Sequence, residues 1–163
     1  MSLTALFNRR RSRGAATLEF ALVAPLYLLL VLGIIEIALL MWVSMTMQFA
    51  VREGARYAAG GTEAAAALNG SQRMSGVVDA IRAQSMGLWD RVTPTLEVSI
   101  NGAPAQPLAL PYGPGALGEA GDLVTLRINC NWPLFSPFVG RFFDAGTYHF
   151  SVAADVRNED GLP

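Results

Sequence analysis

Residue types on which much enzyme chemistry depends are scarce in this chain. It contains no lysine, and Cys130 and His149 are its one cysteine and one histidine. A single cysteine excludes an intrachain disulfide and a multi-cysteine metal site. The sequence also lacks GxSxG, HExxH and a glycine loop ending in lysine, which are patterns of hydrolases, metalloproteases and nucleotide-binding enzymes. We therefore expect no enzymatic activity, no cofactor and no metal site.

Charged residues are also few, at 15% of the chain, whereas hydrophobic residues make up 52%. Soluble proteins carry about 25% charged residues, so part of this chain is expected to avoid water. Four of the twelve arginines stand near the start, at Arg9, Arg10, Arg11 and Arg13, and from Ala15 onward acidic residues outnumber arginines. Because an acidic surface repels a phosphate backbone, we expect no nucleic-acid partner.

A long apolar segment follows the arginines. Between Phe20 and Met47 the only charged residue is Glu36. A helix of that length measures about 42 Å, which exceeds the roughly 30 Å hydrocarbon core of a bilayer. Pro25 is expected to bend this helix. Glu36 either contacts another helix, or its side chain is protonated or snorkels to the interface. Since arginines dominate the leading flank, the positive-inside rule predicts a single-pass protein with a cytoplasmic N-terminus and an extracytoplasmic C-terminal domain.

The sequence divides into three parts. Residues 1–14 form a basic leader, residues 15–60 form one helix that spans the membrane and protrudes from it, and residues 61–163 form an outer domain. The first helix is expected from about Ala15 to Ala59, because the pair Gly60-Gly61 is a typical stop after a helix. A second, amphipathic helix follows in the outer domain. Its apolar face holds Met74, Val77, Val78, Ile81 and Leu88.

The rest of the outer domain has the alternating pattern of β-strands separated by loops rich in proline and glycine. The first strand pattern ends at the turn pair Asn101-Gly102, and the other two begin after loops. We expect no strand or helix within these loops. The predicted fold class is α+β: a long N-terminal transmembrane helix, then a small domain with a helix packed on a short antiparallel sheet. The expected strands are 95–100, 122–131 and 147–157, and the expected loops are 103–121 and 132–146.

The junction between the arginines and the apolar segment has the pattern of a processing site. Gly14 ends the basic leader, and Glu19 and Phe20 follow just inside the apolar segment. A glycine lets an extended backbone enter a protease cleft, and the arginines hold the junction at an anionic membrane face. Cleavage between Gly14 and Ala15 leaves an ammonium group one helical turn from Glu19. A carboxylate near lipid needs a positive partner, either its own N-terminus or that of a neighbouring subunit.

Two simpler interpretations compete with a processing site. One is an ordinary membrane anchor flanked by arginines, in which Glu19 snorkels to the interface. The other is a cleaved secretory signal, but the apolar segment is much longer than the roughly 7–15 apolar residues of such signals.

The spacing of Gly14, Glu19 and Phe20 resembles the cleavage site of type IV pilins and pseudopilins of the Flp class. Glu36 with its apolar neighbours and the segment 52–59 are similar to TadE-like proteins of tight-adherence (Flp) pilus loci. The resemblance implies a minor pseudopilin of the bacterial inner membrane that is cut by a prepilin peptidase. It also implies assembly of an adhesive pilus together with other pilin or pseudopilin subunits and the pilus assembly machinery.

Chain length favours a minor pseudopilin over the main filament subunit, because major Flp pilins are much shorter and lack a comparable domain. Two alternatives remain open at this point. The chain is also compatible with a minor pseudopilin of a type II secretion system, which shares the leader. A membrane-anchored binding domain that never assembles is the second alternative, and it needs no pilin partner.

Other residues of the sequence have less specific interpretations. Cys130 is expected to pack as a small apolar residue rather than to form an intermolecular disulfide. His149 is expected to be structural, and Gly54 either allows close helix packing or is merely tolerated in a helix. An aromatic set is expected to lie in the core or anchor a loop, or else to form a contact surface. Its members are Trp132, Phe135, Phe138, Phe142 and Phe143.

Overall fold

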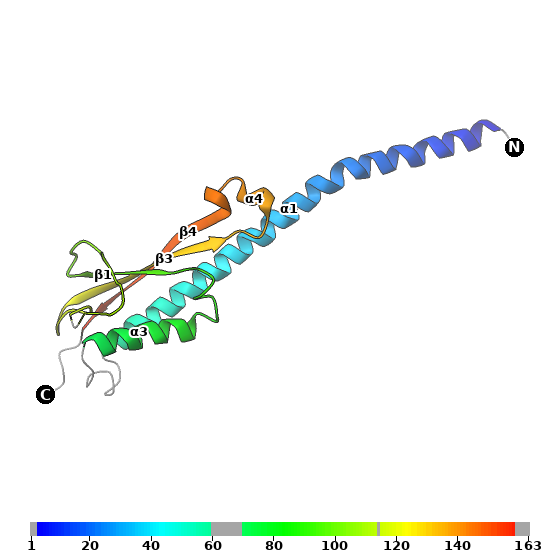
Figure 1. Ribbon diagram of the computed structural model, residues 1–163. Coiled ribbons are helices and arrows are strands. Elements are labelled where there is room, and N and C mark those ends of the chain that lie inside the picture. The colour runs from blue at the N-terminus through cyan, green and yellow to red at the C-terminus, as the bar shows by residue number, and fades with distance from the viewer. Residues whose placement is uncertain (1–2, 60–69, 114, 159–163) are drawn as a thin grey trace. The chain divides into compact units, whose positions relative to one another are not determined.

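The computed structural model describes residues 3–59, 70–113 and 115–158, with side chains from residue 15 onward. The chain divides into two compact units, Met1–Ala38 and Leu39–Pro163. The fold is mixed α+β, as the sequence predicts, with a long N-terminal helix, a second helix and a small antiparallel sheet (Figure 1).

The long helix α1 covers Leu3–Ala58 and continues through Pro25. Its end confirms the prediction, and the predicted stop at Gly60-Gly61 lies outside the described residues. Its beginning differs, because the helix starts within the leader rather than at about Ala15. Leucine, alanine and arginine are good helix formers, so the leader sequence favours a continuation of the helix toward the N-terminus.

The part of α1 that belongs to the second unit carries a buried stripe. Val43, Met47, Ala50, Val51 and Ala55 are buried at spacings of three and four residues, which places them on one face of the helix. This face forms one side of the core of the domain. The apolar character of the helix beyond the membrane segment therefore comes from packing on the domain.

Helix α3, Gly70–Gln84, packs beside the C-terminal part of α1 (Figure 1). Met74, Val77 and Ile81 are its buried residues, which confirms three positions of the predicted apolar face. Leu88 is also buried but lies after the end of the helix. Gly54 explains the close approach, since a Cβ atom there would lie 2.3 Å from Cγ1 of Ile81. The close-packing interpretation of Gly54 is confirmed.

Four antiparallel strands form one sheet in the order β2-β1-β3-β4. The predictions for β1 and β4 are confirmed, while β3 begins one residue later and extends further than expected. β2 was not predicted, and the expectation that its segment forms no sheet pairing is wrong. A two-residue edge strand tolerates proline because only one of its sides needs donors. The strands are β1, Thr95–Ile100; β2, Gln106–Pro107; β3, Leu123–Pro133; and β4, Thr147–Arg157.

A tight turn after β1 explains how β2 pairs. Asn101 and Gly102 both have positive φ angles, of 52° and 75°, and the N–H of Ala103 donates to the carbonyl of Ile100 over 3.0 Å. Positive φ at both central positions is the geometry of hairpin turns that asparagine and glycine favour. The predicted turn is confirmed, and it returns the chain alongside β1.

One face of the sheet is apolar and the other is polar. Val124, Leu126, Ile128 and Cys130 alternate along β3 and are buried against the helices. The intervening side chains lie on the opposite face, where Asn129 donates to Glu97 over 2.9 Å and Thr125 donates to Asp155 over 2.6 Å. Cys130 thus packs as an apolar residue, as expected. Burial raises the pKa of its thiol to about 12.

A polar network fastens the loop before β3 to the end of the sheet. The Asp122 carboxylate accepts from the N–H of Glu119 over 2.8 Å and from the Asn101 amide over 2.7 Å. These two hydrogen bonds, the backbone one first, lower the pKa of Asp122. The buried amide of Asn158 donates to the carbonyls of Leu117 and Glu119 over 2.6 and 2.9 Å. The loop is therefore ordered by side-chain contacts with backbone groups.

The connection between β3 and β4 contains two short helices that the sequence did not predict. They are α4, Pro137–Gly140, and η1, Asp144–Gly146. Ser136 caps α4, because its hydroxyl accepts a hydrogen bond from the N–H of Val139 and Pro137 follows at the first helical position. A serine followed by proline is a helix-start pattern, but a single turn is too short for a periodicity argument.

Candidate functional site

The predicted processing site lies within helix α1. Gly14 and Ala15 both belong to the continuous helix, and Ala15 is exposed. A protease binds its substrate in an extended form, so cleavage at this bond requires local unwinding of the helix. Glycine disfavours the helix by about 1 kcal/mol relative to alanine, so Gly14 is a favourable place for unwinding. Cleavage after Gly14 stays a prediction.

Glu19 lies about one helical turn beyond Ala15, and Phe20 follows it on the same helix. Both side chains are exposed, and Phe20 is 73% accessible. The i, i+4 spacing of Ala15 and Glu19 places them on one face of the helix, as expected. An exposed carboxylate beside exposed apolar side chains is available for contact with another helix or with a new N-terminus.

Glu36 differs from Glu19 because it is buried. Its side chain is 2% accessible, whereas its neighbours Ile35 and Ile37 are exposed. The residue has an interaction within the chain, so its carboxylate is not free. Snorkelling would leave the carboxylate at an interface with water, so burial favours a contact with protein. A contact between Glu36 and the helix of another subunit stays a prediction.

The apolar part of α1 is accessible to lipid. Residues Ala15–Ala58 form a helix that is long and apolar enough to cross a membrane, and only 11% of its most apolar 18-residue window is buried. Large apolar side chains such as Leu22, Leu26 and Leu30 are exposed there. A core helix of a soluble protein would bury such residues. The helix therefore fits a single-pass membrane anchor.

The connection between β3 and β4, residues 134–146, forms a second apolar surface that we call the aromatic loop. Phe135, Phe138 and Phe142 are 78%, 50% and 77% accessible. The expectation that these residues lie in the core is wrong for them, because none of the three belongs to the core cluster or packs against it. Trp132 alone of the predicted aromatic set packs against the core. The alternative interpretation, a contact surface, fits the exposed members.

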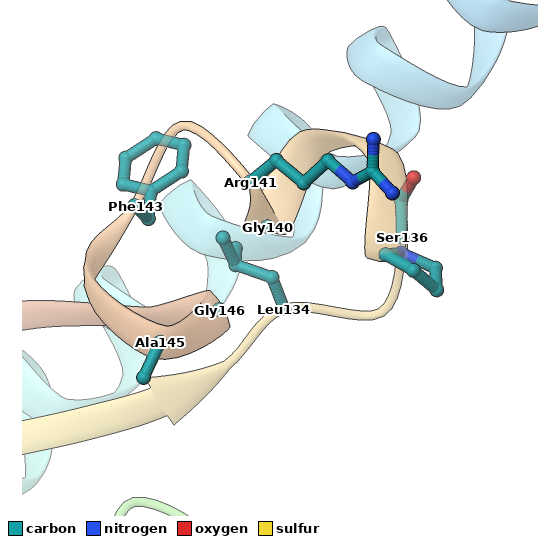
Figure 2. Close-up of a pocket in the computed structure, with 8 residues that line it drawn as sticks. Leu134, Ser136, Gly140, Arg141, Phe143, Ala145 and Gly146 are labelled. Atoms are coloured by element: carbon teal, nitrogen blue, oxygen red, sulfur yellow. The ribbon is translucent and has the colours of Figure 1, made fainter.

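The aromatic loop folds back on itself around a shallow pocket of about 460 Å³. Figure 2 shows Phe143 and Arg141 extending to opposite sides of this pocket. The N–H of Leu134 donates to the carbonyl of Gly146 over 2.9 Å and closes the base of the loop. Phe138 and Phe142 contact each other edge to face, with ring centroids 6.0 Å apart. These contacts hold the exposed rings in a defined arrangement.

A groove of about 840 Å³ lies between helix α1 and the base of the aromatic loop. Leu39 and Trp42 line it from α1, and Met86 lines it from the segment after α3. Trp132 lines it from the end of β3, and Phe135 lines it from the aromatic loop. Sequence reasoning did not identify this groove. Trp42 near the end of the apolar segment was the available indication, because tryptophan is enriched at membrane interfaces.

The remaining predicted residues have structural positions. His149 on β4 is opposite Asn131 on β3, and its Nδ1 lies 2.6 Å from the Asn131 amide oxygen. This cross-strand contact agrees with a structural role. Within residues 3–59, 70–113 and 115–158, no group of three or more histidine, cysteine, aspartate and glutamate side chains could hold a metal ion. The expectations of no metal and no cofactor stay predictions. The structure does not describe the side chains of Arg9, Arg10, Arg11 and Arg13.

The N-terminal helix is also the part of the chain that matches a known family. Residues 14–56 match the family model described as "TadE-like protein". This confirms the resemblance seen in the sequence, and the matched segment begins at the predicted cleavage site. No curated protein and no solved structure matches the chain.

Proposed function

Because the chain is TadE-like over residues 14–56, we propose that it is a minor pseudopilin of a Tad/Flp adhesive pilus. It is made as a precursor, a prepilin peptidase cuts it after Gly14, and it then takes part in pilus assembly. It has no enzymatic activity of its own. The family match over residues 14–56 supports the association with a Tad pilus, and the proposal adds processing and the role of a minor subunit.

The observation that carries the proposal is the position of the family match on an exposed helix. The match covers Gly14, Glu19 and Phe20. The side chains of Glu19 and Phe20 are exposed. Leu18 and Leu22 beside them are exposed as well. A helix with a carboxylate among exposed apolar residues packs well against similar helices, since the carboxylate can pair with the ammonium group of a cut neighbour.

The two units have different tasks in this proposal. The apolar helix holds the chain in the bacterial inner membrane, with the leader in the cytoplasm and the domain on the other side. The domain has its own core, formed by one face of the sheet with α3 and the end of α1. It therefore supplies a surface for other subunits without depending on the leader for its packing.

Photo-crosslinking in cells that carry the pilus genes tests the proposal. A photoreactive phenylalanine analogue at Phe20 is expected to crosslink to another pilin or pseudopilin helix. The matched control places the analogue at Ala105, an exposed residue in the turn between β1 and β2. Glu19→Gln, which keeps the size of the side chain but removes its charge, is expected to weaken the crosslink at position 20 while the chain still inserts into the membrane.

The identity of the crosslinked partner decides among the alternatives. A partner from the Tad pilus supports the proposal, and a partner from a type II secretion system favours the first alternative. A chain that inserts into the membrane but forms no crosslink at position 20 is a membrane-anchored binding domain, and the proposal is then wrong.

A further inference from the structure

The aromatic loop exposes more apolar surface than its place in a water-soluble domain explains. Phe135 and Phe142 are more than three-quarters accessible, and Phe138 is half accessible. Exposed apolar patches of this kind mark interaction sites. The loop is not loose, because Ser136 caps α4 and the Leu134 to Gly146 hydrogen bond closes its base. A fixed group of exposed rings requires a partner that accepts them.

The groove shows which part of α1 the aromatic loop adjoins. Phe135 and Trp132 line the same groove as Leu39 and Trp42, and all four belong to the second unit. The exposed residue Met86 lines it too. The base of the aromatic loop is therefore at the level of Trp42 along the helix.

The rise of the helix sets the depth of Trp42. By its number of residues alone, a helical segment from Arg13, the last arginine of the leader, to Trp42 measures about 44 Å. A bilayer is about 40–45 Å thick when its headgroup regions are included. A membrane-spanning segment of this length, with the arginines at the cytoplasmic headgroups, would end at the headgroups of the outer leaflet, at Trp42. Tryptophan is typical of this level.

We infer that the aromatic loop is a second membrane contact, which lies in the headgroup region of the outer leaflet beside Trp42. Phe135, Phe138 and Phe142 enter the interface, and Arg141 at the same loop faces anionic headgroups. The occupant of this surface is lipid. The contact would hold the domain against the membrane, so that packing of the domain onto other subunits begins from a fixed orientation. The inference rests on the membrane span in the proposed function.

Fluorescence of the full-length chain in vesicles tests the contact. Three variants, Phe142→Cys, Ala105→Cys and Tyr27→Cys, each carry an environment-sensitive dye on the new cysteine, while buried Cys130 stays unlabelled. The vesicles contain phosphatidylethanolamine and phosphatidylglycerol, with or without lipid that bears a quenching nitroxide near the headgroup or deep in the chain. Ala105 is the matched control, since it follows β1 at the end of the sheet opposite the aromatic loop.

The dye at position 142 is expected to emit at shorter wavelength than the dye at position 105 and to be quenched by the shallow nitroxide. The dye at 105 is expected to stay in water, and the dye at 27 is expected to respond to the deep nitroxide. A water-exposed, unquenched dye at 142 with a quenched dye at 27 overturns the inference and leaves the membrane anchor standing. A dye at position 142 that emits at short wavelength but is not quenched lies against protein, such as a second copy of the chain. This result also overturns the inference. No quenching at 27 overturns the anchor and the inference together.

Discussion

Replacing Gly54 by alanine tests the packing that joins α1 to α3. The added Cβ atom would lie 2.3 Å from Cγ1 and 2.7 Å from Cδ1 of Ile81, and 3.3 Å from the carbonyl oxygen of Val77. Carbon atoms in contact prefer separations of about 3.5–4.0 Å. Ile81 is completely buried in the core, so its side chain has little room to move. The two helices must separate or the side chain must leave its rotamer.

Two opposing effects set the size of the change in the free energy of unfolding. Overpacking of a core costs about 1–3 kcal/mol, whereas alanine in place of glycine inside a helix gains about 1 kcal/mol. We therefore expect Gly54→Ala to destabilise the domain by a net ~0–2 kcal/mol. Ile81→Ala removes the two closest atoms that the new Cβ would meet and leaves only the Val77 carbonyl oxygen at 3.3 Å. In that background, Gly54→Ala is expected to stabilise by up to about 1 kcal/mol.

The measurement is a double-mutant cycle by urea unfolding in detergent micelles, followed by the fluorescence of the three tryptophans. The sign change between the two backgrounds corresponds to a coupling energy of about 1–3 kcal/mol, the range expected for residues in contact. Gly33→Ala is the control on the same helix, because nothing lies within 4 Å of a Cβ atom at that position. Equal effects of Gly54→Ala in both backgrounds would refute the packing of Gly54 on Ile81.

Three further predictions concern the second unit, Leu39–Pro163. Hydrogen bonds from the Glu119 N–H and the Asn101 amide lower the pKa of Asp122 in the folded chain. The Asp122 carboxylate therefore contributes stability above the ordinary pKa of 3.8, and this contribution is lost as the pH falls below 3.8 through the lowered pKa. Asp122→Asn should weaken the dependence of the free energy of unfolding on pH in this acid range. Because Cys130 is buried and its thiol pKa is raised to about 12, it should react with a thiol reagent at neutral pH only after unfolding. Asn158→Ala removes a buried hydrogen bond to the Leu117 carbonyl and a partly buried one to the Glu119 carbonyl, and should lower the free energy of unfolding by about 1–3 kcal/mol.

Each of these predictions has a clear opposite result. An unchanged acid limb in Asp122→Asn means that the carboxylate does not hold the loop before β3. Rapid labelling of Cys130 in the folded chain means that β3 is open to solvent at that position. An Asn158→Ala variant as stable as the parent chain means that its amide contacts are replaced by water at no cost.

The elements with strong patterns could be predicted from the sequence. Alternation located β1 and β4, and the apolar face of α3 was correct at Met74, Val77 and Ile81. The Asn101-Gly102 turn was found because its two residues tolerate positive φ. These features depend on neighbours in the sequence, and local patterns report on them well.

The features that escaped prediction depend on contacts between distant residues. β2 is a strand only because the turn brings it beside β1, and α4 depends on the Ser136 cap within a loop rich in proline and glycine. Exposure of Phe135 and Phe142 was expected only as the alternative to core packing, because aromatic residues are usually buried and a loop has no periodicity that shows which side chains face solvent. Sequence reasoning found the processing motif and the membrane segment because both are contiguous, whereas the groove beside Trp42 joins three separate segments.

The most direct test of the proposed function is the intact mass and N-terminal sequence of the membrane-extracted chain, from cells with and without the prepilin peptidase. The proposal predicts a chain that begins at Ala15 when the peptidase is present and retains its leader when it is absent. Gly14→Ala is the matched variant, and it should reduce cleavage in cells with the peptidase because alanine strengthens the helix at the cleavage site. A chain that keeps its leader in both strains would contradict processing and favour a plain membrane anchor, and one that begins beyond the apolar segment would indicate a discarded secretory signal.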